Sequence, residues 1–254
     1  MDHIFWTELF QNLFRWVHVV AGILWIGLLY FFNFVNSSFA PTMDGETKKK
    51  VVPELMPRAL FFFRWGAAFT WVSGILLMAL VFYHYGITFE SGKWWSSAAS
   101  IMIAVTFFGV FLYDPLSKAI KNQCAFAIVG FILITAIVCT YQCYAGFSYR
   151  GALIHTGALF GTIMAFNVWF RIWPAQQKIM AAIKGGQAPD AALVGLAGLR
   201  SKHNTYLSVP LVWTMLNAHS TFLSSYWWSL PVVIAIGWLT TNHLYKISAK
   251  VKGI

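Results

Sequence analysis

Three histidines, His18, His155 and His219, stand in otherwise apolar stretches and have the clearest potential for chemistry. Ionisable side chains in such stretches are functional candidates, because burying a charge in hydrocarbon is costly. Neutral imidazole is an axial ligand of haem iron, and facing helices of a bundle hold a haem between them. We therefore predict a haem b whose iron is bound by two of these histidines. A three-histidine copper or zinc site, serving metal handling or transport, is the alternative.

Residues close to these histidines suit a haem. Gly22 and Trp25 lie four and seven residues after His18, on the same helical face, where they would give a flat macrocycle room and an aromatic wall. Arg15 and Arg150 precede the first two histidines by three and five residues. Arginine pairs with anionic propionates, whereas contact with lipid headgroups is the alternative interpretation. There is no Cys-x-x-Cys-His motif, so a covalently attached haem c is not expected.

A second polar group follows in the last third of the chain. Its members are His203, Asn204, Arg200, Asn167, Arg171 and Trp173. His203 and His219 are sixteen positions apart, about 24 Å along a helix, so they cannot share one site. The group fits a second haem site completed by His243, a quinone or substrate pocket, or a polar cap on two helix ends.

Composition identifies the elements that must position these residues. Of the 254 residues 59% are hydrophobic and only 10% are charged, which predicts an all-α integral membrane protein. A helix crosses the hydrocarbon with about 20 apolar residues. We predict a single transmembrane domain over residues 1–254, with about seven spans: 14–35, 59–83, 94–113, 124–145, 151–173, 204–220 and 226–245.

The distribution of basic residues predicts the orientation. Fifteen of the 18 lysines and arginines fall on one side of the seven spans, which assigns that side to the cytoplasm. The N-terminus is then outside and the C-terminus cytoplasmic, and His18, His155 and His219 lie near the outer surface. Because the bases occupy short loops between apolar runs, the net charge of +10 does not indicate nucleic-acid binding.

Four segments resemble a known family. WVHVVAGILWIGLLYFFNFVN (16–36), FFRWGAAFT (62–70), FNVWFRIWPAQQKI (166–179) and RSKHNTYLSVP (200–210) resemble the membrane domain of bacterial urate hydroxylases, the urate oxidase N-terminal family. The resemblance implies an oxidoreductase of the bacterial inner membrane that passes electrons from urate to a fused cytochrome c domain. The residues that match the family pattern are His18, Trp25, Asn167, Trp173, Arg200, His203 and Asn204.

The sequence departs from the family pattern at its C-terminal end, where no cytochrome c domain follows the seventh predicted span. We therefore expect a membrane-embedded haem b electron-transfer protein that passes electrons to a separate cytochrome c, or serves as the haem-bearing subunit of a redox complex. If it is an enzyme, it is of the urate hydroxylase type. A non-catalytic membrane anchor or stabilising subunit of a larger complex is the remaining alternative.

Overall fold

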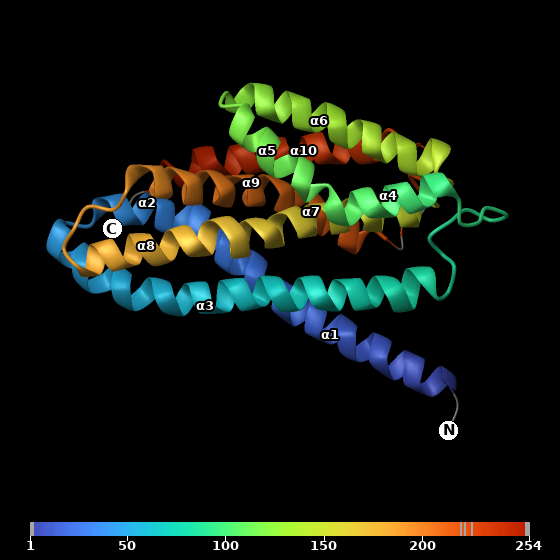
Figure 1. Ribbon diagram of the computed structural model, residues 1–254, viewed down its shortest axis with the longest axis horizontal. Coiled ribbons are helices and arrows are strands. Elements are labelled where there is room, and N and C mark those ends of the chain that lie inside the picture. Colours follow the sequence, from blue (N-terminus) through green and yellow to red (C-terminus); the bar gives the residue numbers. More distant parts are fainter. Residues whose placement is uncertain (1–2, 219, 221, 225, 252–254) are drawn as a thin grey trace. The chain divides into compact units, whose positions relative to one another are not determined.

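The computed structural model describes residues 3–218, 220, 222–224 and 226–251, and every regular element in this part of the chain is a helix (Figure 1). Two residues, Phe89 and Phe147, form an isolated β-bridge. The predicted all-α class is confirmed.

The first two long helices are longer than predicted. They are α1 (His3–Tyr30), continued by η1 (Phe31–Asn36), α2 (Ser37–Phe39) and η2 (Ala40–Thr42), and α3 (Gly45–Leu77), continued by η3 (Met78–Tyr83). The predicted connection 36–58 is therefore helical over most of its length. Asp44 explains where α3 begins, because its carboxylate accepts hydrogen bonds from the backbone N–H groups of Glu46 and Thr47.

A bent pair, α4 (Ser97–Phe108) and α5 (Val110–Ala119), contains the third predicted span. The two helices meet at Gly109 at an angle of 54° (Figure 1). A Cβ atom at Gly109 would lie 2.7 Å from the Val105 carbonyl oxygen and 2.9 Å from Leu159 Cδ1. Glycine is thus the residue that this bend accommodates.

The remaining helices are α6 (Gln123–Cys139), η4 (Thr140–Tyr144), α7 (Tyr149–Asn167), η5 (Val168–Ile172), α8 (Trp173–Lys184), α9 (Ala191–Leu216) and α10 (Ser229–Ser248). Helix α9 is continuous through Pro210, so the apolar stretch 191–199 belongs to the same helix as the sixth predicted span. Four of the short segments, η1, η3, η4 and η5, are π-helical. Such segments occur frequently at functional sites.

Among the residues that the structure describes, four helical stretches are long and apolar enough to cross a membrane: Ile4–Thr42, Gly45–Tyr83, Gln123–Tyr144 and Tyr149–Lys184. The bent pair α4–α5 is a fifth if it forms one span. These stretches cover all or most of each of the first five predicted spans. The sixth and seventh, in α9 and α10, do not meet the same criterion, so the count of seven and the orientation stay predictions.

The chain forms two compact units. Unit 1 comprises residues 1–11, 75–163 and 208–239, and unit 2 comprises residues 12–74, 164–207 and 240–254. One core of unit 1 joins α4, η4 and α7 through Met102, Tyr141, Phe147 and their neighbours. A core of unit 2 joins α8 and α9 through Ala175, Ile179, Ile183 and Ala197.

Candidate functional site

A pair of buried amides lies at the centre of the polar group in unit 2. Asn167, at the end of α7, donates from Nδ2 to Asn204 Oδ1 of α9 at 2.9 Å. Asn204 in turn donates from Nδ2 to the Met164 carbonyl oxygen at 3.0 Å. Both asparagines are completely buried. The structure therefore brings two of the residues predicted from the family pattern into direct contact, across 37 positions of sequence.

Arg200 lies one helical turn before Asn204 on α9 and is 1% exposed. A guanidinium removed from water must be well hydrogen-bonded, and it is suited to holding an anion through its planar set of donors. Its charge also acts on the half-buried His203. Unit 2 therefore has a positively charged, amide-lined interior at this level of α9.

Trp173, another residue of the family pattern, is held by an arginine of α3. The Arg64 guanidinium carbon lies 4.0 Å from the centroid of the Trp173 ring, which is a cation–π contact. The indole N–H of Trp169 donates to the Arg64 carbonyl oxygen at 3.1 Å. Arg64 belongs to the FFRWGAAFT motif, but it was not predicted as a site residue and entered only the count of basic residues that predicts the membrane orientation. Arg171 makes local contacts instead, donating to the Phe170 carbonyl oxygen.

Asn33 connects three helices of unit 2 and was not predicted. From η1, its Nδ2 donates to the Leu29 carbonyl oxygen at 2.9 Å and to Ser201 Oγ of α9 at 2.7 Å. Its Oδ1 accepts from the Tyr245 hydroxyl of α10 at 2.9 Å. An asparagine in an apolar run was the available signal, since such side chains join helices within membranes.

His18 contacts α3 within unit 2. Its Nδ1 lies 3.2 Å from Ser73 Oγ, whose proton is donated to the Phe69 carbonyl oxygen. With Nδ1–H as the donor to Ser73, the lone pair of the ring would lie on Nε2. A Cβ atom at Gly74 would lie 3.0 Å from His18 Cε1, so Gly74 provides the space for this ring. Ser73 is near the middle of the predicted second span.

The face of α1 that carries Gly22 and Trp25 packs against α3. A Cβ atom at Gly22 would lie 3.9 Å from Thr70 Cγ2, at ordinary contact distance. Trp25 is 1% exposed, and its Cβ lies 3.3 Å from the position of a Cβ at Gly66. These two residues therefore join two helices of unit 2.

His155 of unit 1 has a partner at each ring nitrogen. Its Nδ1–H donates to the Gly151 carbonyl oxygen at 2.7 Å, and its Nε2 accepts from the Tyr83 hydroxyl at 2.8 Å. The side chain is fully buried, with the Phe147 ring edge-on at 4.7 Å between centroids. The nitrogen that would bind a metal is already an acceptor for a phenol.

The surroundings of His155 are formed by the π-helical segments η3 and η4 and by a close approach of the backbone at Gly151 to Thr88. Tyr83 ends η3, and Tyr141 of η4 hydrogen-bonds Thr106 at 2.7 Å beside the same imidazole. A Cβ atom at Gly151 would lie only 2.1 Å from the Thr88 carbonyl oxygen. Neither tyrosine was predicted, because both contacts join helices far apart in sequence.

The residues fit a haem unequally. His18 Nδ1 lies 3.2 Å from the Ser73 hydroxyl, whereas His155 has a hydrogen-bond partner at each ring nitrogen. The two histidines belong to different units, and His219 lies outside the described residues. His243 is exposed. Arg15 is exposed and Arg150 is partly buried. Within the described part of the chain, no group of three or more His, Cys, Asp or Glu residues is arranged to hold a metal ion.

Comparison with known proteins gives one match. The family model described as urate oxidase N-terminal matches residues 45–253. This range includes Asn167, Trp173, Arg200, His203 and Asn204, and begins after His18 and Trp25. No curated protein and no solved structure matches the chain.

Proposed function

The chain belongs to the urate oxidase N-terminal family, and from this membership we propose that it is the membrane domain of a urate-hydroxylase-type oxidoreductase. The observation that carries the proposal is the buried group formed by Arg200, Asn204 and Asn167 in unit 2. Residues that match the family pattern at separate places in the sequence meet there.

The chemistry of this group suits urate, which is planar, anionic and bordered by carbonyl and N–H groups. Arg200 would neutralise the anion and donate two parallel hydrogen bonds. The amides of Asn167 and Asn204 contain donors and acceptors of the kind that match the purine edge. Hydroxylation of urate by water releases two electrons and two protons. His203, next to Arg200 on α9, would accept a proton as general base.

We also propose that the chain holds a haem b and serves as the electron-transfer partner of a separate cytochrome c or another redox subunit. When bound, haem supplies one-electron transfer at its iron. His18 would hold the iron through Nε2, with Ser73 fixing the orientation of the ring through Nδ1–H. Arg15 and Arg150 are the arginines proposed for the propionates.

The proposed setting is a bacterial inner membrane, crossed seven times with the N-terminus outside. Four apolar helices and the bent pair α4–α5 support a multi-pass protein. The unequal distribution of the 18 lysines and arginines supports the orientation.

Urate-dependent reduction of added cytochrome c, followed optically in membranes that contain the protein, tests the function. Arg200→Gln should lower kcat/KM for urate by about ten- to a hundredfold, as expected when a charge-assisted hydrogen bond is lost. Lys178→Gln, an exposed change on α8 in the same unit, is the matched control and should keep wild-type activity. Both variants must elute as monodisperse protein.

Two results would contradict the proposal. One is an Arg200→Gln variant with wild-type kinetics, which would remove the site from unit 2. The other is a wild-type protein that oxidises no urate with any cytochrome c acceptor, which would favour the membrane-anchor alternative.

A further inference from the structure

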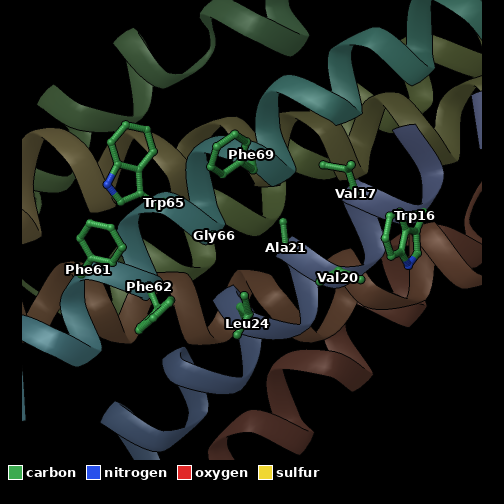
Figure 2. A pocket seen from close by; sticks show the side chains of 10 residues that line it. All are labelled: Trp16, Val17, Val20, Ala21, Leu24, Phe61, Phe62, Trp65, Gly66 and Phe69. Carbon is green, nitrogen blue, oxygen red and sulfur yellow. The ribbon is translucent and has the colours of Figure 1, made fainter. Parts of the chain in front are cut away.

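An apolar groove runs between α1 and α3 on the surface of unit 2. Its volume is about 660 Å³. Figure 2 shows the lining side chains, of which five come from each helix: Trp16, Val17, Val20, Ala21 and Leu24 from α1, and Phe61, Phe62, Trp65, Gly66 and Phe69 from α3. All are apolar or aromatic. The site proposed for urate uses none of these residues.

The groove lies beside the point where the backbones of α1 and α3 come closest. Its large aromatic side chains are partly exposed there, so they do not fill it. At Gly66 the backbones approach so closely that a Cβ atom would lie 3.2 Å from the Ala21 carbonyl oxygen. Beside this contact, Phe62 is 53% exposed and Trp65 is 40% exposed. Both helices belong to candidate membrane spans, so in the proposed membrane setting these rings would face hydrocarbon. An occupant of the groove is therefore an apolar chain.

The groove lining on α3 runs from Phe61 to Phe69, about 12 Å of helix, and Arg58 places a cation one turn beyond its end. Arg58 precedes Phe61 by three residues and Trp65 by seven, so it lies on the groove face of α3. From Arg58 to Phe69 is eleven residues, about 16 Å of helix, compared with about 15 Å for half of the hydrocarbon core. A lipid chain lying along the groove would place its headgroup beside Arg58.

Basic side chains surround that end of α3. Lys48, Lys49, Lys50 and Arg58 lie on α3, and Lys184 ends α8. The charge of Lys184 acts on Glu54, and Lys49 Nζ lies 3.3 Å from the position of a Cβ at Gly186, so the two helix ends are neighbours.

Three acids accompany these five bases. Hydrogen bonds from Thr47 hold the pKa of Asp44 below its ordinary value, so this carboxylate is ionised and engaged with the start of α3. Glu54 pairs with Arg58 at 2.7 Å, and Glu46 is exposed. The excess of positive charge favours an anionic headgroup.

We propose that the α1–α3 groove binds an anionic phospholipid, with one acyl chain between the two helices and the phosphate at Arg58 and the neighbouring lysines. The aromatic walls of the groove would bind the acyl chain, and the basic residues would bind the anionic headgroup. It needs neither urate nor haem, so its failure would leave the proposed function untouched.

Native mass spectrometry of the purified protein, with phosphatidylglycerol or phosphatidylcholine added at equal concentration, tests the proposal. We expect wild type to retain phosphatidylglycerol at least about fivefold more than phosphatidylcholine, the effect of one basic residue near an anionic headgroup. Arg58→Gln should lose this preference.

Groove-filling variants test the chain-binding part. Val20→Trp places a large ring in the groove and should abolish retention of phosphatidylglycerol. Val19→Trp adds the same ring at a neighbouring exposed position of α1 that does not line the groove, and should retain it. Thermal stability of both variants checks that they are folded. Equal retention of the two lipids by wild type, or full retention by a folded Val20→Trp variant, would overturn the proposal.

Discussion

Gly66 is the residue at which the packing of α1 on α3 is most sensitive to one added methyl group. In a Gly66→Ala variant the new Cβ would lie 3.2 Å from the Ala21 carbonyl oxygen, 3.2 Å from the Trp25 backbone nitrogen and 3.3 Å from Trp25 Cβ. These atoms cannot rotate away as a side-chain end can, so α1 itself must shift. Overpacking of this kind costs about 1–3 kcal/mol. Alanine returns about 1 kcal/mol through its higher helix propensity.

Gly27→Ala is the matched control, because Gly27 also lies on a helix of this pair and has nothing within 4 Å of the new methyl group. It receives the propensity gain without the overpacking, so the two variants should differ by about 1–3 kcal/mol. We would measure the midpoint of heat-induced loss of monodisperse protein in detergent. Gly66→Ala should have a lower midpoint than Gly27→Ala, and it should weaken lipid retention in the groove. If Gly66→Ala were as stable as Gly27→Ala, the close approach of the two backbones would be refuted.

Three further predictions concern unit 1 and the topology. Tyr83→Phe removes the donor to His155 Nε2 and should destabilise the protein by about 1–3 kcal/mol, since a buried acceptor loses its partner; unchanged thermal stability would argue against this bond. Gly151→Ala places a Cβ 2.1 Å from a backbone carbonyl oxygen and should impair folding, measured as yield of monodisperse protein. Gly130→Ala, with open space around it, should not. A reporter active only outside the cytoplasm should be active when inserted between residues 86 and 93 and silent when fused after residue 254, and the reverse pattern would invert the proposed orientation.

The helical class and most helix positions follow from the sequence, because long apolar runs in a charge-poor chain leave few alternatives. The helix boundaries were predicted less accurately from the sequence. Apolar side chains from Ile4 to Leu13 extend α1 before the predicted span, and the cap at Asp44 starts α3 well before the hydrophobic run. The π-helical segments could not be predicted, because the pattern of apolar residues does not show where a turn contains one extra residue. Packing against neighbouring helices determines that position.

The sequence predicted some residues of the polar contacts in the candidate sites and missed their partners. It grouped Asn167 with Asn204, because both flank the same predicted connection. It missed Arg64, Asn33 and Tyr83, whose partners lie between 72 and 212 positions away. Whether an apolar helix face meets another helix or a cofactor also depends on such contacts. Gly22 and Trp25 were assigned to a haem, and in unit 2 they pack on α3.

The hydrogen bonds of the two histidines predict which of them binds haem iron. The Nδ1 of His18 lies beside Ser73, and as a donor there it would leave the lone pair on Nε2, whereas the Nε2 of His155 already accepts from Tyr83. We therefore expect His18→Ala to lose the haem b band in dithionite-reduced spectra and the haem extracted by acid acetone. His155→Leu should instead lower thermal stability, because it removes an acceptor from a buried phenol, while haem per folded protein stays at the wild-type level. Haem lost from folded His155→Leu and kept by His18→Ala would show that Tyr83 gives way to iron, and the assignment of His18 as the haem ligand would be wrong. A folded wild-type protein from haem-replete cells with no Soret band would reject the haem b proposal itself, leaving Ser73 and Tyr83 as purely structural partners of these imidazoles.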